Sequence, residues 1–85
     1  MRRVSYSRDA TRTLDRIPAN TARLIRGKIE QYAEAPESLA NNVKALNGRP
    51  GYSRLRIGDW RVIFSETRVV VSVERVAPRG SAYGQ

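Results

Sequence analysis

The chain has 85 residues, enough for one small domain, and carries 16 basic against 8 acidic residues for a formal net charge of +8. Fourteen of the basic residues are arginine, whose guanidinium suits bidentate contacts with phosphate. There is no Cys and no His, which excludes disulfides, thiolate catalysis and imidazole bases, so we expect neither a metal nor a cofactor. No apolar run is long enough for a membrane span and no signal-peptide core is present, so the sequence predicts a cytoplasmic protein without membrane contact.

The first half of the chain predicts one strand followed by two helices. Apolar and polar residues alternate over residues 4–7, and Ser7 can then cap a helix whose apolar residues recur at helical spacing as far as Pro18. A second periodic segment ends at Pro36. Two helices joined by so short a connection should lie antiparallel.

The second half predicts a sheet. We expect residues 37–51 to form a loop anchored by Leu39, Val43 and Leu46, and residues 53–57, 60–65 and 69–76 to form strands. The resulting β-α-α-β-β-β order predicts a single α+β domain over residues 1–85, with a twisted, mainly antiparallel sheet and the helix pair packed on one face.

The segment YSRLRIGDWRVIF, residues 52–64, places three arginines in a predicted hairpin. Gly58 and Asp59 suit a two-residue turn, which sets Arg56 opposite Arg61. Because side chains alternate between faces, Arg54 shares that face. Like charges across a hairpin repel each other, so the pattern favours a face that binds a polyanion such as the phosphates of a nucleic acid. A solvated outer face is the simpler alternative.

The register of the last strand depends on the turn near residues 65–68. With Ser65 opposite Arg68, the sequence predicts that Ser72 lies opposite Arg61 and that Val69 joins Trp60 on the core face.

The C-terminal residues add an arginine and an aromatic ring. Arg79 is followed four residues later by Tyr83, and Pro78 and Gly80 keep this segment out of regular structure. An aromatic ring beside a basic patch is typical of sites for single-stranded RNA, in which bases stack on the ring. The alternative is a frayed tail.

The other arginines are interpreted as solvated, with additional contacts to RNA phosphates as the alternative. Arg2 and Arg3 form a basic start of the chain, and residues such as Arg12 and Arg16 lie on helix faces away from the apolar stripes.

The pattern LNGRPGYSRLRIGDWRVIF, the valine-rich strand after it and the closing VAPRGSAY resemble the RelE branch of the RelE/ParE toxins of bacterial type II toxin–antitoxin operons. The resemblance covers nearly the whole chain. It implies a ribosome-dependent endoribonuclease, an mRNA interferase that cuts message in the A site and inhibits translation. The implied partners are the ribosome with its mRNA, a cognate acidic antitoxin, and operator DNA only through the antitoxin complex.

The resemblance also implies roles for single residues. Arg61 matches the arginine that holds the scissile phosphate, and Arg54 falls at a basic active-site position that is often lysine. Arg79 matches the arginine that assists the leaving 5′-oxygen, and Tyr83 the tyrosine that stacks on or orients the substrate nucleotide. Arg56 matches a position that is basic in many relatives without a settled role, and we expect it to contact RNA.

Two departures bear on the chemistry. Pro78 stands where many relatives have histidine, and Arg54 cannot act as a general base because arginine does not lose its proton. Tyr83 is the one titratable residue among the implied site residues. Two other functions stay open from the sequence: a ParE-like toxin that acts on DNA gyrase through protein contacts, and an RNA-binding module without catalytic activity.

Overall fold

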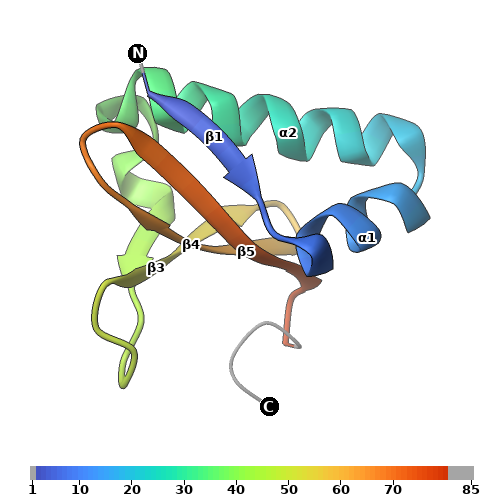
Figure 1. Ribbon diagram of the computed structural model, residues 1–85. Helices are drawn as coiled ribbons and strands as arrows, with labels where there is room; N and C mark the ends of the chain where they lie inside the picture. The colour runs from blue at the N-terminus through green and yellow to red at the C-terminus, as the bar shows by residue number, and fades with distance from the viewer. Residues whose placement is uncertain (1, 81–85) are drawn as a thin grey trace.

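The computed structural model describes residues 2–80, which form an α+β fold with a five-stranded mixed sheet and two α-helices packed on one face of it (Figure 1). The predicted fold class is confirmed. The elements in chain order are β1 (Arg3–Tyr6), α1 (Arg8–Arg16), α2 (Ala19–Glu34), the 3₁₀ helix η1 (Pro36–Asn42), β2 (Val43–Ala45), β3 (Tyr52–Ile57), β4 (Trp60–Glu66) and β5 (Val70–Pro78).

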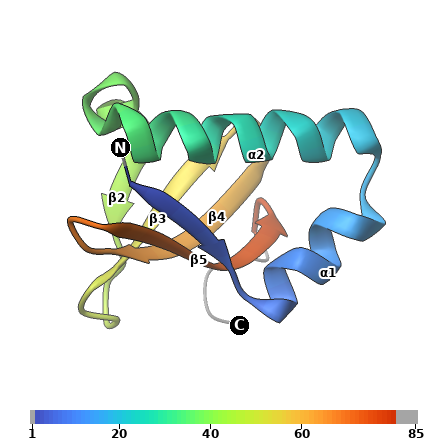
Figure 2. The ribbon, with the colours of Figure 1, turned by 45° about the horizontal axis from the view of Figure 1, so that its top comes forward.

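The strands follow the order β1-β5-β4-β3-β2 across the sheet. The chain leaves β1, forms both helices on one face and returns at the opposite edge as β2; it then crosses the sheet strand by strand until β5 lies beside β1 (Figure 2). The β1–β5 pair is parallel and the other pairs are antiparallel. A parallel pair needs a long crossover connection, which the helices and the intervening strands supply.

The core lies between the helices and the sheet, as the sequence predicts. Ser7 caps α1: its hydroxyl accepts a hydrogen bond from the Ala10 backbone N at 3.0 Å and donates one to the Glu74 carbonyl at 2.6 Å. The largest fully buried side chains of this core are Ile25, Ile29, Leu55, Val62, Phe64, Val71 and Val73. No helix in the described part of the chain is long and apolar enough to cross a membrane.

The prediction of a loop over residues 37–51 is wrong for its first half. A 3₁₀ helix occupies Pro36–Asn42 and the edge strand β2 follows at Val43–Ala45. Neither element is long enough to produce a periodic apolar pattern, so periodicity could not reveal them. The predicted anchors are confirmed, because Leu39 and Val43 pack in or against the core and Leu46 packs against a small cluster on the other face of the sheet.

The predicted position of Val69 on the core face is wrong. The Thr67 hydroxyl accepts hydrogen bonds from the backbone N of Val69 and of Val70, both at 3.1 Å, and closes a turn that extends to Val70. Val69 therefore lies in the turn, with 63% of its surface exposed.

The predicted pairing of Ser72 with Arg61 is also wrong. Ser72 lies opposite Ser65, and Arg61 lies opposite Ala77. Two local features cause the change: the turn, closed by the hydrogen bond from the Thr67 backbone N to the Val70 carbonyl, lies two residues further along the chain than predicted, and a β-bulge interrupts the β4–β5 ladder between Ile63 and Phe64.

Arg2 is a structural residue and not a solvated start of the chain. Its guanidinium forms an ion pair with Glu66 at 2.5 Å and donates to the carbonyls of Tyr32 (3.3 Å) and Ala33 (3.2 Å) in the last turn of α2. The Tyr32 hydroxyl donates to the other oxygen of Glu66 at 2.6 Å. Burial, and then this hydrogen bond, raise the pKa of Tyr32 to about 12, so the hydroxyl remains a donor at neutral pH.

We expect Arg2→Ala to lower the free energy of unfolding by about 1.5–3 kcal/mol, because it removes charge-assisted hydrogen bonds to two helix carbonyls and a carboxylate. Urea denaturation followed by Trp60 fluorescence measures the change. Arg3→Ala is the matched control, since Arg3 is exposed and its side chain makes no hydrogen bond or ion pair with residues 2–80. Equal stability of the Arg2 and Arg3 variants would contradict this role.

Candidate nucleic-acid interface

The candidate site lies at the end of the β3–β4 hairpin, and its register is as predicted. Arg56 lies opposite Arg61, and Ile57 lies opposite Trp60. Gly58 adopts a φ of +57°, in the left-handed region that favours glycine, which explains why the turn begins with this residue. The two arginines therefore share the face of the sheet that points away from the helices.

Arg61 is buried within this face, with 8% of its surface exposed. Its Nη1 donates hydrogen bonds to the carbonyl oxygens of Gly58 at 2.9 Å and of Trp60 at 3.0 Å. Both acceptors belong to the hairpin turn. The guanidinium is thus held in a fixed orientation by the turn, which the alternation of side chains in the sequence could not show.

The structure adds a cation that sequence reasoning missed. Lys44 in β2 lies directly opposite Arg54 in β3, so its exposed amine belongs to the same face. In the sequence, the only indication of this strand is the alternation of apolar and charged residues over Val43, Lys44 and Ala45. With Lys44, three neighbouring strands contribute cations to one face: Lys44 from β2, Arg54 and Arg56 from β3, and Arg61 from β4.

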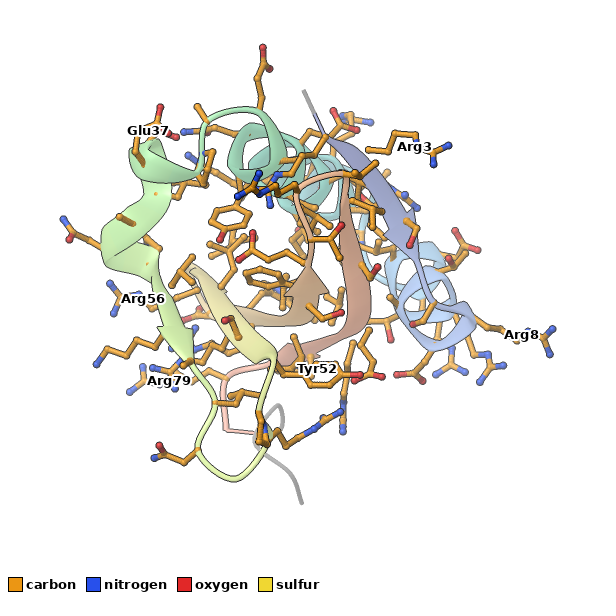
Figure 3. All side chains as sticks on the ribbon, turned by 60° about the vertical axis from the view of Figure 1, so that its left-hand side comes forward. Arg3, Arg8, Glu37, Tyr52, Arg56 and Arg79 are labelled. Atoms are coloured by element: carbon orange, nitrogen blue, oxygen red, sulfur yellow. The ribbon has the colours of Figure 1, made fainter. Side chains whose placement is uncertain are left out.

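Arg79 joins the same end of the sheet. Its backbone N donates to the Asp59 carbonyl at 2.7 Å, which ties the residue after β5 to the hairpin turn. Its side chain is exposed and lies on the same side of the molecule as that of Arg56 (Figure 3). The structure therefore brings Arg56, Arg61 and Arg79 together around the turn, whereas Tyr83 lies outside the described residues.

The face is not uniformly basic. A second, small apolar cluster lies on it, with Ile63 and Ala77 buried and Leu46 and Tyr52 packed against them. This cluster lies between the cations of the turn and the pair described next.

An ion pair between Arg49 and Glu74 occupies the far side of the apolar cluster. The guanidinium of Arg49 lies 2.7 Å from a Glu74 oxygen and stacks over the Tyr52 ring, 4.2 Å from its centroid. Its charge is compensated there, in contrast to the exposed Arg56 and Arg79. Within residues 2–80 no group of His, Cys, Asp or Glu side chains could hold a metal ion.

Comparison with known proteins identifies the class of protein that has this fold. The model of the family described as the ParE toxin of the type II toxin–antitoxin system parDE matches residues 4–83. The chain therefore belongs to this family of toxins and to the RelE/ParE superfamily. A search of curated protein sequences gave no match.

Solved structures show the same fold. A chain of the archaeal RelE–RelB complex from Pyrococcus horikoshii OT3 is 26% identical over 95% of this chain and 98% of that chain, with a TM-score of 0.76. The isolated Escherichia coli RelE toxin is 16% identical over 96% and 88%, with a TM-score of 0.75. A chain of the E. coli DinJ–YafQ toxin–antitoxin complex is 19% identical over 98% of both chains, with a TM-score of 0.68.

We expect Arg61→Ala to lower the free energy of unfolding by about 1–3 kcal/mol, because the carbonyls of Gly58 and Trp60 lose their charged donor. Its cross-strand neighbour provides the matched control. Arg56→Ala removes the same charge from an exposed position and should change stability by less than about 0.5 kcal/mol, or raise it by relieving repulsion. Chemical denaturation of both variants makes the comparison, and equal losses would show that Arg61 does not stabilise the turn.

Proposed function

We propose that this toxin is a ribosome-dependent endoribonuclease that cleaves mRNA in the A site and so inhibits translation. The observation that carries the proposal is the gathering of Arg54, Arg56, Arg61 and Arg79 at the hairpin end of one sheet face. Fixed cations on an exposed face match the negative charge of a phosphodiester and of its transition state. The similar P. horikoshii structure is that of a RelE–RelB complex, which supports the RelE-like assignment.

The reaction needs little chemistry from the protein. The 2′-oxygen of the RNA attacks the adjacent phosphorus, the bond from phosphorus to the 5′-oxygen breaks, and the products are a 2′,3′-cyclic phosphate and a 5′-hydroxyl. In this proposal Arg54 and Arg61 stabilise the charge of the phosphorane and Arg79 assists the leaving 5′-oxygen. The turn carbonyls orient Arg61 before substrate binds, so little reorganisation is needed at the moment of reaction.

The proton of the 2′-hydroxyl needs an acceptor, and the arginines cannot provide one. Tyr83 remains the proposed candidate for stacking on the nucleotide, with a secondary role in proton transfer.

A second candidate function is a toxin that acts on DNA gyrase. One observation favours it: the matching family is described as the ParE toxin of parDE. A protein target needs no phosphate-binding site. The two candidates predict different damage in the cell, namely cut message or broken DNA.

We also propose that a cognate antitoxin with an acidic segment covers the cationic face, and that the complex contacts operator DNA through the antitoxin. A chain of net charge +8 with several exposed arginines favours a partner of opposite charge. An acidic segment that is disordered alone can fold as it binds such a surface.

Induction of the toxin without antitoxin, followed by mapping of message 5′ ends, tests the enzymatic proposal. We expect new 5′ ends within translated codons, and we expect Arg79→Ala to reduce their formation by roughly a hundredfold, the scale on which loss of one transition-state donor acts. Arg68→Ala is the matched control, since Arg68 is an exposed arginine in the turn between β4 and β5, at the other end of β4. Gyrase-linked DNA breaks without cut message would establish the second candidate instead.

The association rate of toxin and antitoxin should fall as salt rises, because oppositely charged surfaces steer each other at low ionic strength. Stopped-flow mixing of the two purified proteins at several salt concentrations measures it. Arg56→Ala should lower the rate at low salt and flatten the dependence. A rate that is indifferent to salt would argue against charge as the basis of this recognition.

A further inference from the structure

The β-bulge in β5 changes which residues of this strand lie on the cationic face, the side of the sheet that points away from the helices. Phe64 in β4 pairs with Val73 in β5. The residue before it, Ile63, pairs with Arg75, so one residue of β5 has no partner in the ladder. Strict alternation from Val73, whose side chain is in the core, would turn Arg75 toward the helices. The bulge instead places Arg75 on the same face as Ile63.

Arg75 extends a row of cations across this face. Ile63 lies between Arg54 on β3 and Arg75 on β5, and Lys44 lies beyond Arg54 on β2. Because neighbouring strands are about 4.8 Å apart, the backbones of the two arginines are separated by about 10 Å. The Ile63 side chain between them is buried, and both arginines are half-buried. This is the arrangement expected where the aliphatic stems of arginines cover an apolar side chain and leave the guanidinium groups in solvent.

The charge of Arg75 is not compensated within residues 2–80. Its side chain makes no ion pair or hydrogen bond with any of these residues. The adjacent Glu74 pairs with Arg49, and Asp9, which borders the same edge of the sheet, is not within ion-pair distance. β1 pairs with β5 only as far as Val73, so no strand covers the outer side of Arg75. A guanidinium in this position is available to an anion.

The cations of this face form two rows. The row beside the hairpin turn contains Arg56 and Arg61, and the next row contains Arg54 and Arg75. The rows are two residues apart along the strands, which is about 7 Å. That separation is similar to the distance between successive phosphates of an extended RNA strand. The face can therefore bind two neighbouring phosphates of one strand.

We propose that Arg75 is a phosphate-binding residue of this toxin, which binds the phosphate next to the scissile one while Arg54 and Arg61 bind the scissile phosphate itself. The ligand is single-stranded RNA with at least two internucleotide phosphates, an identity that rests on the proposed ribonuclease function. Arg75 takes no part in breaking the bond. Because its contact is the same in the ground state and in the transition state, it contributes to the affinity for the message and not to the rate of the chemical step.

Binding of short 2′-O-methyl RNAs, which lack the attacking hydroxyl and stay intact, tests this proposal. Without terminal phosphates, a trinucleotide carries two internucleotide phosphates and a dinucleotide carries one. In the full-length toxin we expect Arg75→Gln to weaken binding of the trinucleotide by about tenfold, the effect of one charge-assisted hydrogen bond, and to leave binding of the dinucleotide nearly unchanged. The slope of the logarithm of affinity against that of salt concentration should fall by about 0.7 for the trinucleotide, because one phosphate contact is lost. Isothermal titration calorimetry at several salt concentrations measures both.

Two further variants make the result specific. Arg54→Gln should weaken binding of both RNAs, because it removes a contact with the phosphate that they share. Arg68→Gln is the matched control and should change neither affinity, since Arg68 is an exposed arginine in the turn before β5. Glutamine retains much of the aliphatic stem beside Ile63, so Arg75→Gln should keep the fold, which circular dichroism verifies.

Equal effects of Arg75→Gln on the two RNAs would overturn the subsite, as would an equal effect of Arg68→Gln on the trinucleotide. A wild-type toxin without measurable affinity for the trinucleotide at low salt would overturn it as well. Mapped message 5′ ends score the proposed function separately. A toxin that binds the trinucleotide through Arg75 as expected, but cuts no message, disproves the ribonuclease function and leaves the subsite in place.

Discussion

The Gly58–Asp59 turn is the constraint on which the candidate site depends. Three of its carbonyls are held by donors from within the domain: those of Gly58 and Trp60 by the Arg61 guanidinium, and that of Asp59 by the backbone N of Arg79. These bonds join β3, β4 and the end of β5 at one point. Arg61 and Arg79 therefore take their positions from this turn, and Arg56 lies opposite Arg61 beside it.

A small domain with an excess of positive charge must arrange it so that repulsion does not unfold the chain. The two ion pairs within residues 2–80, Arg2–Glu66 and Arg49–Glu74, both lie away from the turn. The first ion pair stabilises the end of α2, and the second stabilises the part of β5 that contains the bulge. At the turn itself the Arg61 guanidinium, which lies opposite Arg56, donates hydrogen bonds to the backbone carbonyls of Gly58 and Trp60.

The parts of this structure that the sequence could predict are those set by local chemistry. A two-residue turn determined the whole β3–β4 register, and the N-cap and the prolines delimited the helices. The register of β5 could not be predicted, because it depends on the capture of two backbone groups by the Thr67 hydroxyl and on a bulge, neither of which alters the valine alternation. Lys44 was missed with its short strand, and the burial of Arg61 was missed because alternation gives the face of a side chain and not its contacts.

The same limit applies to function, because one fold serves toxins with different targets and cannot choose among them. The ParE description of the family and the RelE names of similar structures are both compatible with this sheet. The choice between these two functions depends on whether the exposed arginines contact a phosphodiester or the surface of a protein. Arg56 and Arg79 extend outwards beside an Arg61 that the turn has already oriented, an arrangement that matches the several oxygens of a phosphodiester. A protein surface would need only the charge of Arg56 and Arg79, whereas phosphate chemistry would also need an oriented guanidinium, which among these residues the turn carbonyls provide for Arg61.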